Sequence, residues 1–330
     1  MLAIPDPFPR IALPEGFELK SLQDKEKSDN VPGSPGFTLA VLADIHANLT
    51  ALDAVLQDMK QFKVGGIIAA GDHIGDGPQP AEVLRRLREL DASLIRGNRE
   101  DYLLNYDGGM LPEWDGALQW SAMVWTYHQL GREMLHFLSS MPGQEVLVYP
   151  GMDSLRVVHG SPADSNELIC VLSNPDKVRQ VLSGIDETVM ICAHSHEKWT
   201  YSTETRIAVN PGSVGVPFNA KRCAEYALLH WNGETWEAVH RYVRYDLAAV
   251  SEIYDASGYI DAGGAWARSV LASIKAGRNI SMEFMDYVLR KVRESGMGEP
   301  EVIPNKIWEE ADRNWDWEGS SFVARGFIPG

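Results

Sequence analysis

Short apolar runs alternate with amphipathic segments through the middle of the chain. Apolar residues run almost without interruption over 37–43, 64–70 and 93–96, as in buried strands. Between them, 49–62 and 80–90 repeat apolar positions every three or four residues, which predicts helices packed by one face. Strand–helix–strand alternation of this kind predicts right-handed crossovers and a parallel sheet. The pattern therefore indicates an α/β fold that begins near residue 37.

The later part of the chain adds strands, a helix and a hairpin. Further strands are expected around 145–149, 155–158, 188–193 and 206–210, and a helix near 174–183. The alternating segments EYALLHW and TWEAVHRYV flank Asn232-Gly233, and this pair predicts a hairpin turn in which both residues have positive φ. Residues 112–141 are expected to form one inserted helix rich in Trp, Met and His.

The two ends differ in character from this central region. Residues 1–36 contain six prolines, and because proline fixes φ and lacks an N–H donor, we expect an extended arm there. Its apolar side chains are expected to lie against the body: Phe8, Ile11, Leu13 and Phe17. After the main domain, 37–245, residues 246–330 are expected to form a mainly helical extension. Its tryptophans are expected to pack on the domain, with a partner-binding surface as the alternative: Trp266, Trp308, Trp315 and Trp317.

Charge and cysteine content limit the partners and the compartment. The formal net charge of −16, from 46 acidic and 30 basic residues, repels polyphosphate backbones and argues against binding to long nucleic acid. A small charged nucleotide stays compatible with a metal-lined cleft. The three cysteines are widely spaced without a C-x-x-C pair, which favours a reducing, cytoplasmic setting over disulfides or a thiolate zinc site. The sequence shows neither a signal peptide nor a run of roughly 20 apolar residues, so no membrane partner is expected, while a homo-oligomer stays open.

Polar side chains of metal-binding type follow five successive predicted strands. In chain order they are Asp44 and His46, then Asp72, then Asn98, then His159, then His194 and His196. Ligands of open α/β sheets bind outside the carboxyl ends of the strands, so we expect these seven side chains to meet. Residues at i and i+2 of an extended chain face the same way, which would let Asp44 act with His46 and His194 with His196.

Carboxylate, imidazole and amide donors together suit transition metals: Mn, Fe, Zn, Ni or Co. Seven donors exceed one tetrahedral zinc site, but they fit two divalent or trivalent ions roughly 3.5–4 Å apart that share one carboxylate. Such a pair lowers the pKa of a bound water and neutralises charge on a phosphoryl oxygen. Taken singly, each motif has an ordinary alternative, such as a Gly-Asp turn or a hydrogen-bonded histidine. Their order and their common placement after strands favour the metal interpretation.

The order D-x-H, G-D, G-N, H-G and H-x-H resembles the calcineurin-like metallophosphoesterases. The blocks LADIHANLTALDAVL, GDHIGDGPQPAEVLRRL, IRGNRED, VVHGSP, AHSH and VNPGSVGVP look like the compact bacterial and archaeal phosphodiesterase-like branch, over about residues 37–245. The resemblance implies two facing mixed β-sheets flanked by helices, with a dimetal site at the sheet edge. One metal would be held by Asp44, His46 and His196, the other by Asn98, His159 and His194, with Asp72 bridging both.

The sequence departs from the family pattern in three places. Arg99 stands where most members have a histidine that protonates the leaving group or orients phosphate, and Ala193 replaces the usual glycine before H-x-H. His73 and Asp76 lie in a loop that is usually apolar or aromatic. Because the pKa of arginine is too high for a general acid, Arg99 is predicted to clamp a phosphoryl oxygen. The alternative is a surface arginine paired with Glu100 or Asp101.

These observations predict hydrolysis of a phosphate monoester or diester by a metal-bridging hydroxide. Asp72, Asn98, Arg99 and His159 would be catalytic, and Arg99, Asn98 and His73 would contact substrate, with His73 as an alternative proton donor. One rival is a nuclease, which the acidic charge disfavours. The other is a non-catalytic metal-binding scaffold of the same fold, which the presence of all seven donor residues disfavours.

Overall fold

The computed structural model describes residues 31–298 and 300–321 of the chain. Most of the expected N-terminal arm lies outside this range, including Phe8, Ile11, Leu13 and Phe17. The division at residues 36 and 245 stays a prediction. Within the described part, no helix has both the length and the hydrophobicity required of a membrane span.

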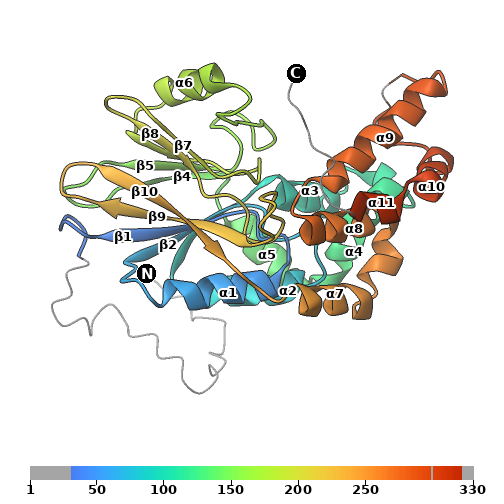
Figure 1. The fold of residues 1–330 in the computed structure, drawn as a ribbon, viewed down its shortest axis with the longest axis horizontal. Coiled ribbons are helices and arrows are strands. Elements are labelled where there is room, and N and C mark those ends of the chain that lie inside the picture. Colours follow the sequence, from blue (N-terminus) through green and yellow to red (C-terminus); the bar gives the residue numbers. More distant parts are fainter. Residues whose placement is uncertain (1–30, 299, 322–330) are drawn as a thin grey trace, which may run out of the picture.

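Ten strands form two five-stranded mixed sheets, ordered β10-β9-β1-β2-β3 and β4-β5-β6-β8-β7 (Figure 1). The first contains β1 (Thr38–Leu42), β2 (Gly66–Ala70), β3 (Ala92–Ile95), β9 (Ala224–Trp231) and β10 (Trp236–Val243). The second contains β4 (Gln144–Leu147), β5 (Leu155–Val158), β6 (Val189–Ile191), β7 (Trp199–Ser202) and β8 (Ile207–Asn210). Strands β1, β2 and β3 are mutually parallel, as are β5, β6 and β8, whereas β9, β10, β4 and β7 pair antiparallel. The predicted pair of mixed sheets is therefore confirmed.

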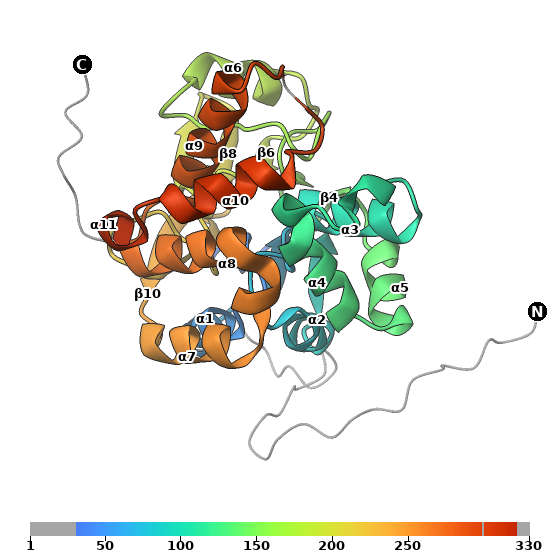
Figure 2. The same ribbon diagram turned by 90° about the vertical axis from the view of Figure 1, so that its right-hand side faces the viewer.

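The helices cover the outer faces of the sheets and gather at one end of them (Figures 1 and 2). In the first half they are α1 (Leu49–Met59), α2 (Pro80–Arg88), α3 (Asn98–Asp107), the 3₁₀ turns η1 (Pro112–Trp114) and η2 (Leu118–Trp120), α4 (Ser121–Gln129) and α5 (Arg132–Ser140). Then follow α6 (Pro175–Ser183), α7 (Leu247–Ala256), α8 (Tyr259–Ala276), α9 (Ile280–Glu294), α10 (Asn305–Asn314) and α11 (Trp317–Ser321). The C-terminal region is helical, as predicted.

Apolar side chains from both sheets pack together in the space between them. Strand β1 is buried at all five positions, and its Leu39 and Val41 meet Val157 and Ile191 of the second sheet in one core cluster. On the opposite face of β1, Ala40 and Leu42 pack against α1 and α2. Helix α6 covers the outer face of the second sheet. Burial on both faces explains why the central strands are continuous apolar runs rather than alternating ones.

Several local predictions are wrong in detail. Residues 112–141 form two 3₁₀ turns and two separate helices, because proline, a glycine at φ +76° (Gly116) and an extended Leu130-Gly131 interrupt the pattern. The hairpin turn spans four residues, since Trp231 pairs with Trp236, and of the Asn-Gly pair only Gly233 has a positive φ. The Asn232 side chain instead accepts hydrogen bonds from the backbone N–H groups of residues 234 and 235.

The C-terminal helices pack both on the domain and on one another. Val250, Tyr254 and Val270 join Ala122 of α4 and Val216 in a shared cluster. By contrast, the last three tryptophans surround Phe284 of α9 and so pack within the extension: Trp308, Trp315 and Trp317. The extension is therefore anchored through α7 and α8, and also through Asn305 of α10, which hydrogen-bonds the backbone of Gly116 and Leu118. Helices α9–α11 share their core with Ala265 of α8 and with Leu118.

Candidate metal centre

All seven predicted ligands lie at the carboxyl ends of parallel strands, shared between the two sheets. The segments that follow β1, β2 and β3 provide four of them, with Asn98 as the first residue of α3, and the loops after β5 and β6 provide the other three. They fall into two compact groups, Asp44–His46–His196 and Asp72–His159–His194, in each of which the potential ligand atoms lie within 4.8 Å of one another. Asn98 joins the second group, because its Oδ1 is 3.0 Å from Nε2 of His159. The expected meeting place is thus formed by both sheets rather than one.

The backbone reaches this arrangement through left-handed residues. Five of the ligands have positive φ: Asp44 (51°), His46 (47°), Asp72 (51°), His194 (65°) and His196 (56°). The expectation that extended residues at i and i+2 share a face is therefore wrong, although each pair still reaches one site. Backbone hydrogen bonds hold these turns, from His46 N–H to Asp72 C=O (2.9 Å) and from Ala193 N–H to His159 C=O (2.7 Å). Ala193 itself has no positive φ, so a side chain is accommodated there.

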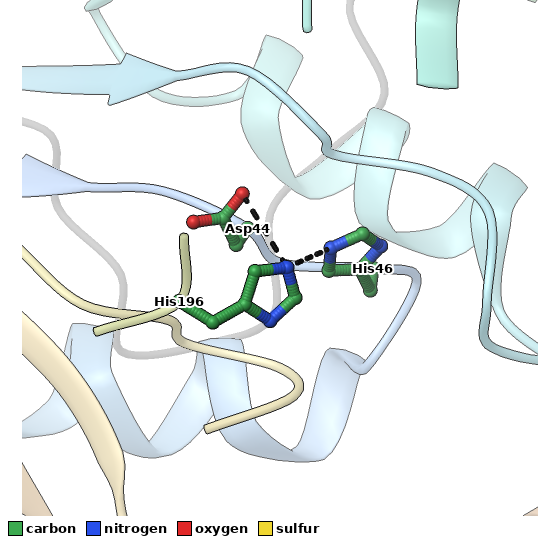
Figure 3. Close-up of side chains that lie close together, drawn as sticks. All are labelled: Asp44, His46 and His196. Atoms are coloured by element: carbon green, nitrogen blue, oxygen red, sulfur yellow. Dashed lines mark hydrogen bonds and ion pairs between the residues drawn. The ribbon is translucent and has the colours of Figure 1, made fainter. Parts of the chain in front are cut away.

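In the first group, three donors converge from two loops (Figure 3). The Nε2 atoms of His46 and His196 lie 3.1 Å apart, and Nε2 of His196 is 3.8 Å from a carboxylate oxygen of Asp44. The other ring nitrogen of His196 donates to the carbonyl of Val216 at 2.8 Å. That bond orients the ring and leaves the lone pair of Nε2 on the side of the group, as metal-binding histidines require.

The second group is built the same way. Nδ1 of His159 donates to the carbonyl of Ala70 at 2.8 Å, which leaves Nε2 facing the carboxylate of Asp72. Oδ2 of Asp72 lies 3.3 Å from Nε2 of His159 and 3.7 Å from Nε2 of His46. A single carboxylate oxygen therefore faces both groups, which is the geometry that a bridging ligand needs.

The electrostatics of the cluster fit cations. Asp44 is fully buried, and neither of its carboxylate oxygens has a hydrogen-bond partner among the described residues. Burial, together with the nearby Asp72, raises the pKa of Asp44 to about 7 against the opposing effect of His159 and His46. Burial and His159 lower the pKa of His194 to about 4, so its imidazole is neutral and able to bind metal. Burial lowers the pKa of His159, but Asp72 and Asp44 outweigh it and raise the value to about 10. The buried carboxylate of Asp44, which has no hydrogen-bond partner among the described residues, and the neutral imidazole of His194 are donors suited to transition-metal ions, and the two aspartates hold a positive charge on His159.

Arg99 lies at the edge of this cluster and lines the adjoining cavity. Its Nη2 is 2.7 Å from Oδ2 of Asp76, and its backbone N–H donates to Oδ1 of Asp72 at 2.9 Å. The alternative of a surface pair is wrong, because Glu100 is buried and Asp101 pairs with Arg96. Contact between Arg99 and a phosphoryl oxygen stays a prediction.

The expectation that His73 contacts substrate is wrong. Its side chain is fully buried and does not line the cavity. Nε2 of His73 donates to the carbonyl of Ile95 at 2.9 Å, while burial lowers the pKa of the ring. His73 therefore packs behind the site and joins the loop after β2 to strand β3, which also removes it as a proton donor to a leaving group.

A buried carboxylate that sequence reasoning missed organises two of the ligand loops. Glu100 is fully buried and accepts four backbone hydrogen bonds, from Asp72, His73, Ile74 and Gly97 at 2.7–3.1 Å. Glu100 stands three residues after the N-cap Gly97 and accepts a hydrogen bond from its backbone N–H, which is the glutamate half of a capping box. Because Gly97 has no side chain, the sequence lacks the Ser or Thr that would have revealed this cap. Gly97 also leaves room for the bridging carboxylate, since a Cβ there would lie 2.2 Å from Oδ1 of Asp72.

Next to the donors is a cavity of about 800 Å³. Besides ligands and Arg99, its walls include residues of the loop after β5, namely Leu168, Cys170, Leu172 and Ser173. The C-terminal extension contributes Trp266, Val270, Arg278, Asn279, Ser281 and Met282. The sequence did not indicate these residues, because none stands directly at the end of a strand as the metal donors do, and only tertiary packing brings them to the site.

Two sheets with paired groups of metal donors at their common carboxyl edge define the class of metallophosphoesterases. Residues 37–234 match the calcineurin-like phosphoesterase superfamily domain, and the chain belongs to this family. It is 28% identical over 229 residues to the uncharacterized protein MJ0912 of Methanocaldococcus jannaschii, covering 65% of this chain and 90% of that protein.

Two solved structures have a similar fold. The metallophosphoesterase from Sphaerobacter thermophilus is 25% identical and superposes with a TM-score of 0.59, covering 73% of this chain and 99% of that one. The hypothetical protein PH1004 from Pyrococcus horikoshii OT3 is 20% identical with a TM-score of 0.59, covering 66% and 92%. The expected family is thereby confirmed.

Proposed function

We propose that this protein is a cytoplasmic phosphoesterase that hydrolyses small phosphate monoesters or diesters with two transition-metal ions. The observation that carries the proposal is the placement of Asp72, whose Oδ2 lies within 3.7 Å of histidine nitrogens of both donor groups. Membership of the calcineurin-like family supports it. The ions would be Mn, Fe, Zn, Ni or Co, held by the seven donors described above.

The protein's own residues would bind and orient the phosphoryl group. The ions, when bound, supply Lewis acidity that activates water and offsets phosphoryl charge. Asn98 and Arg99 stand at the cavity side of the cluster, and Nε of Arg99 is buried without a hydrogen-bond partner among the described residues. This N–H group could donate a hydrogen bond to a phosphoryl oxygen of the substrate. Because arginine does not release its proton and His73 faces away, esters with good leaving groups should be favoured.

The cavity supports a substrate that carries an organic group on its phosphate. Its outer walls are largely apolar, with Leu168, Leu172 and Met282 partly exposed at 60%, 79% and 48%. Apolar walls around a few fixed polar groups are typical of small-molecule sites. The net charge of −16 gives less support to the nuclease alternative.

The test is hydrolysis of nitrophenyl phosphate and bis-nitrophenyl phosphate after metal removal and reconstitution with each candidate ion. We expect turnover to require metal and Asp72→Asn to lose both activity and bound metal. Asp91→Asn, an exposed aspartate at the opposite end of β3, should behave as wild type. Two bound ions with turnover no higher than that of Asp72→Asn would leave the non-catalytic scaffold as the better explanation. Faster cleavage of DNA or RNA than of either ester would favour the nuclease.

A further inference from the structure

Asp76 occupies the loop after β2, beside the first donor group. Its side chain is buried, and its backbone is left-handed with φ +60°. Oδ2 lies 2.7 Å from Nη2 of Arg99 and 3.3 Å from Nδ1 of His46. Oδ1 accepts a hydrogen bond of 2.7 Å from the indole N–H of Trp266. One carboxylate therefore contacts a proposed metal ligand, the proposed phosphate contact and the C-terminal extension.

The extension holds Asp76 at two points. Trp266 of α8 bonds its side chain, while the hydroxyl of Tyr254 of α7 donates to its backbone carbonyl at 2.7 Å. Tyr254 is 1% exposed and belongs to the cluster that fixes α7 and α8 on the domain. The Trp266 ring also lies 6.0 Å from the guanidinium carbon of Arg99. Both aromatic residues follow residue 234, where the match to the family domain ends.

The orientation of His46 differs from that of two other histidine ligands, His159 and His196. His159 and His196 each donate Nδ1–H to a fixed backbone carbonyl. Nδ1 of His46 instead lies 3.3 Å from the carboxylate oxygen Oδ2 of Asp76, with no backbone carbonyl of the described residues bonded to it. Since the second nitrogen of a metal-binding histidine sets its tautomer and ring plane, the position of Asp76 controls this ligand.

We propose that Asp76 is a positioning residue that fixes both His46 and Arg99, and that Trp266 and Tyr254 of the C-terminal helices hold it in place. On this proposal the C-terminal extension positions residues of the metal centre and is not an independent module. This inference rests on the proposed function for its catalytic consequence, but its effect on metal binding does not require turnover.

The experiment compares three variants in the full-length protein: Trp266→Phe, Asp76→Asn and Trp317→Phe. Trp266→Phe keeps an aromatic ring but removes the N–H that holds Asp76. Trp317→Phe is the matched control, since it removes an indole N–H bond to the Asp312 carbonyl within the same extension. For each we would measure the affinity for Mn²⁺ and Zn²⁺ by competition with a chelating dye, KM and kcat on bis-nitrophenyl phosphate, and Tm.

We expect Asp76→Asn to weaken binding of one metal ion about 10- to 100-fold, the usual effect of losing a partner that orients a ligand. Trp266→Phe should weaken it in the same direction and raise KM, while Trp317→Phe leaves both unchanged. A loss of Tm in Trp266→Phe with unchanged metal affinity and KM would overturn the inference, because it would assign Trp266 a packing role alone. If wild type binds metal but hydrolyses nothing, the proposed function fails while the affinities still decide the role of Asp76.

Discussion

At the scale of single residues, the ligands occupy backbone conformations that L-residues avoid. A left-handed non-glycine residue costs about 1–2 kcal/mol, and Asp44, His46 and Asp72 all have φ near +50°. Strain of this kind persists where surrounding structure over-determines it, typically at functional sites. Here the surrounding structure is the set of backbone bonds between the loops after β1 and β2. The sequence could predict which donors follow each strand, but it carries no signal for these φ angles.

Arg99 offers the sharpest residue-scale prediction. Arg99→Ala should lower kcat/KM about 10- to 1000-fold, as expected for loss of one electrostatic contact to the phosphoryl group. Metal content should not change, because the N–H that donates to Asp72 belongs to the backbone and survives the substitution. Arg99→His should improve turnover of poor leaving groups, since imidazole can donate a proton near neutral pH.

The measurement uses an activated nitrophenyl ester and a plain alkyl phosphate ester as parallel substrates. Arg85→Ala serves as control, because that arginine is 53% exposed on α2 and pairs only with Glu82 among the ion pairs found in the described residues. If both Arg99 variants match wild type on both substrates, the phosphoryl group has another contact.

At the scale of elements, predictability followed the strength of the apolar pattern. The β1–α1–β2–α2–β3 unit was predicted because its strands are buried on both faces and its helices have one apolar face. Strand β7 was missed because four residues with mixed exposure give too short a pattern. Helix α3 was missed because two of its buried residues are polar, the ligand Asn98 and Glu100. Its first turn therefore lacks the periodic apolar positions from which a helix is predicted.

Glu100 of α3 joins the loop after β2 to the start of α3 through its four backbone hydrogen bonds. Glu100→Gln should lower the free energy of unfolding by on the order of 2–4 kcal/mol. The amide has only one oxygen to accept the four N–H bonds, and its NH₂ group would face backbone N–H groups that also donate. Urea denaturation of metal-free protein would measure this. Glu82→Gln, with a side chain 43% exposed on α2, should change stability little. Equal effects of the two substitutions would show that the four bonds contribute nothing measurable.

At the scale of the whole molecule, the C-terminal extension completes the wall of the cavity at the metal centre. The sequence of the extension contains no motif that indicates this role. Helices could be predicted for residues 246–295, and their tryptophans were expected to pack. That Trp266 would reach Asp76 could not be predicted, because the contact joins segments 190 positions apart. It depends on how closely α8 approaches α4 at one end of the sheets (Figure 2).

A larger side chain at Gly263 tests whether the close packing of α8 on α4 matters for the metal centre. A Cβ at this position would lie 3.2 Å from Cβ of Ala122 on α4 and 2.8 Å from Cβ of Ala267 within α8, so a larger side chain must displace α8 from α4 and distort α8 itself. Gly263→Leu should cost about 1–3 kcal/mol of stability by overpacking. Trp266 lies three positions beyond Gly263, across a kink at Gly264 (φ 57°, ψ −135°), and the buried Ala265 and Ala267 pack around that kink. We therefore expect the displacement to shift Trp266 as well, so the variant should bind metal more weakly and show a higher KM, measured well below its Tm. Ala262→Leu, exposed on the neighbouring position of the same helix, is the matched control and should retain wild-type Tm, metal affinity and KM. A lower Tm with unchanged metal affinity and KM would mean that the seating of α8 supports the fold without reaching the metal centre. A joint loss confined to Gly263→Leu would tie the docking of the extension to the geometry around Asp76.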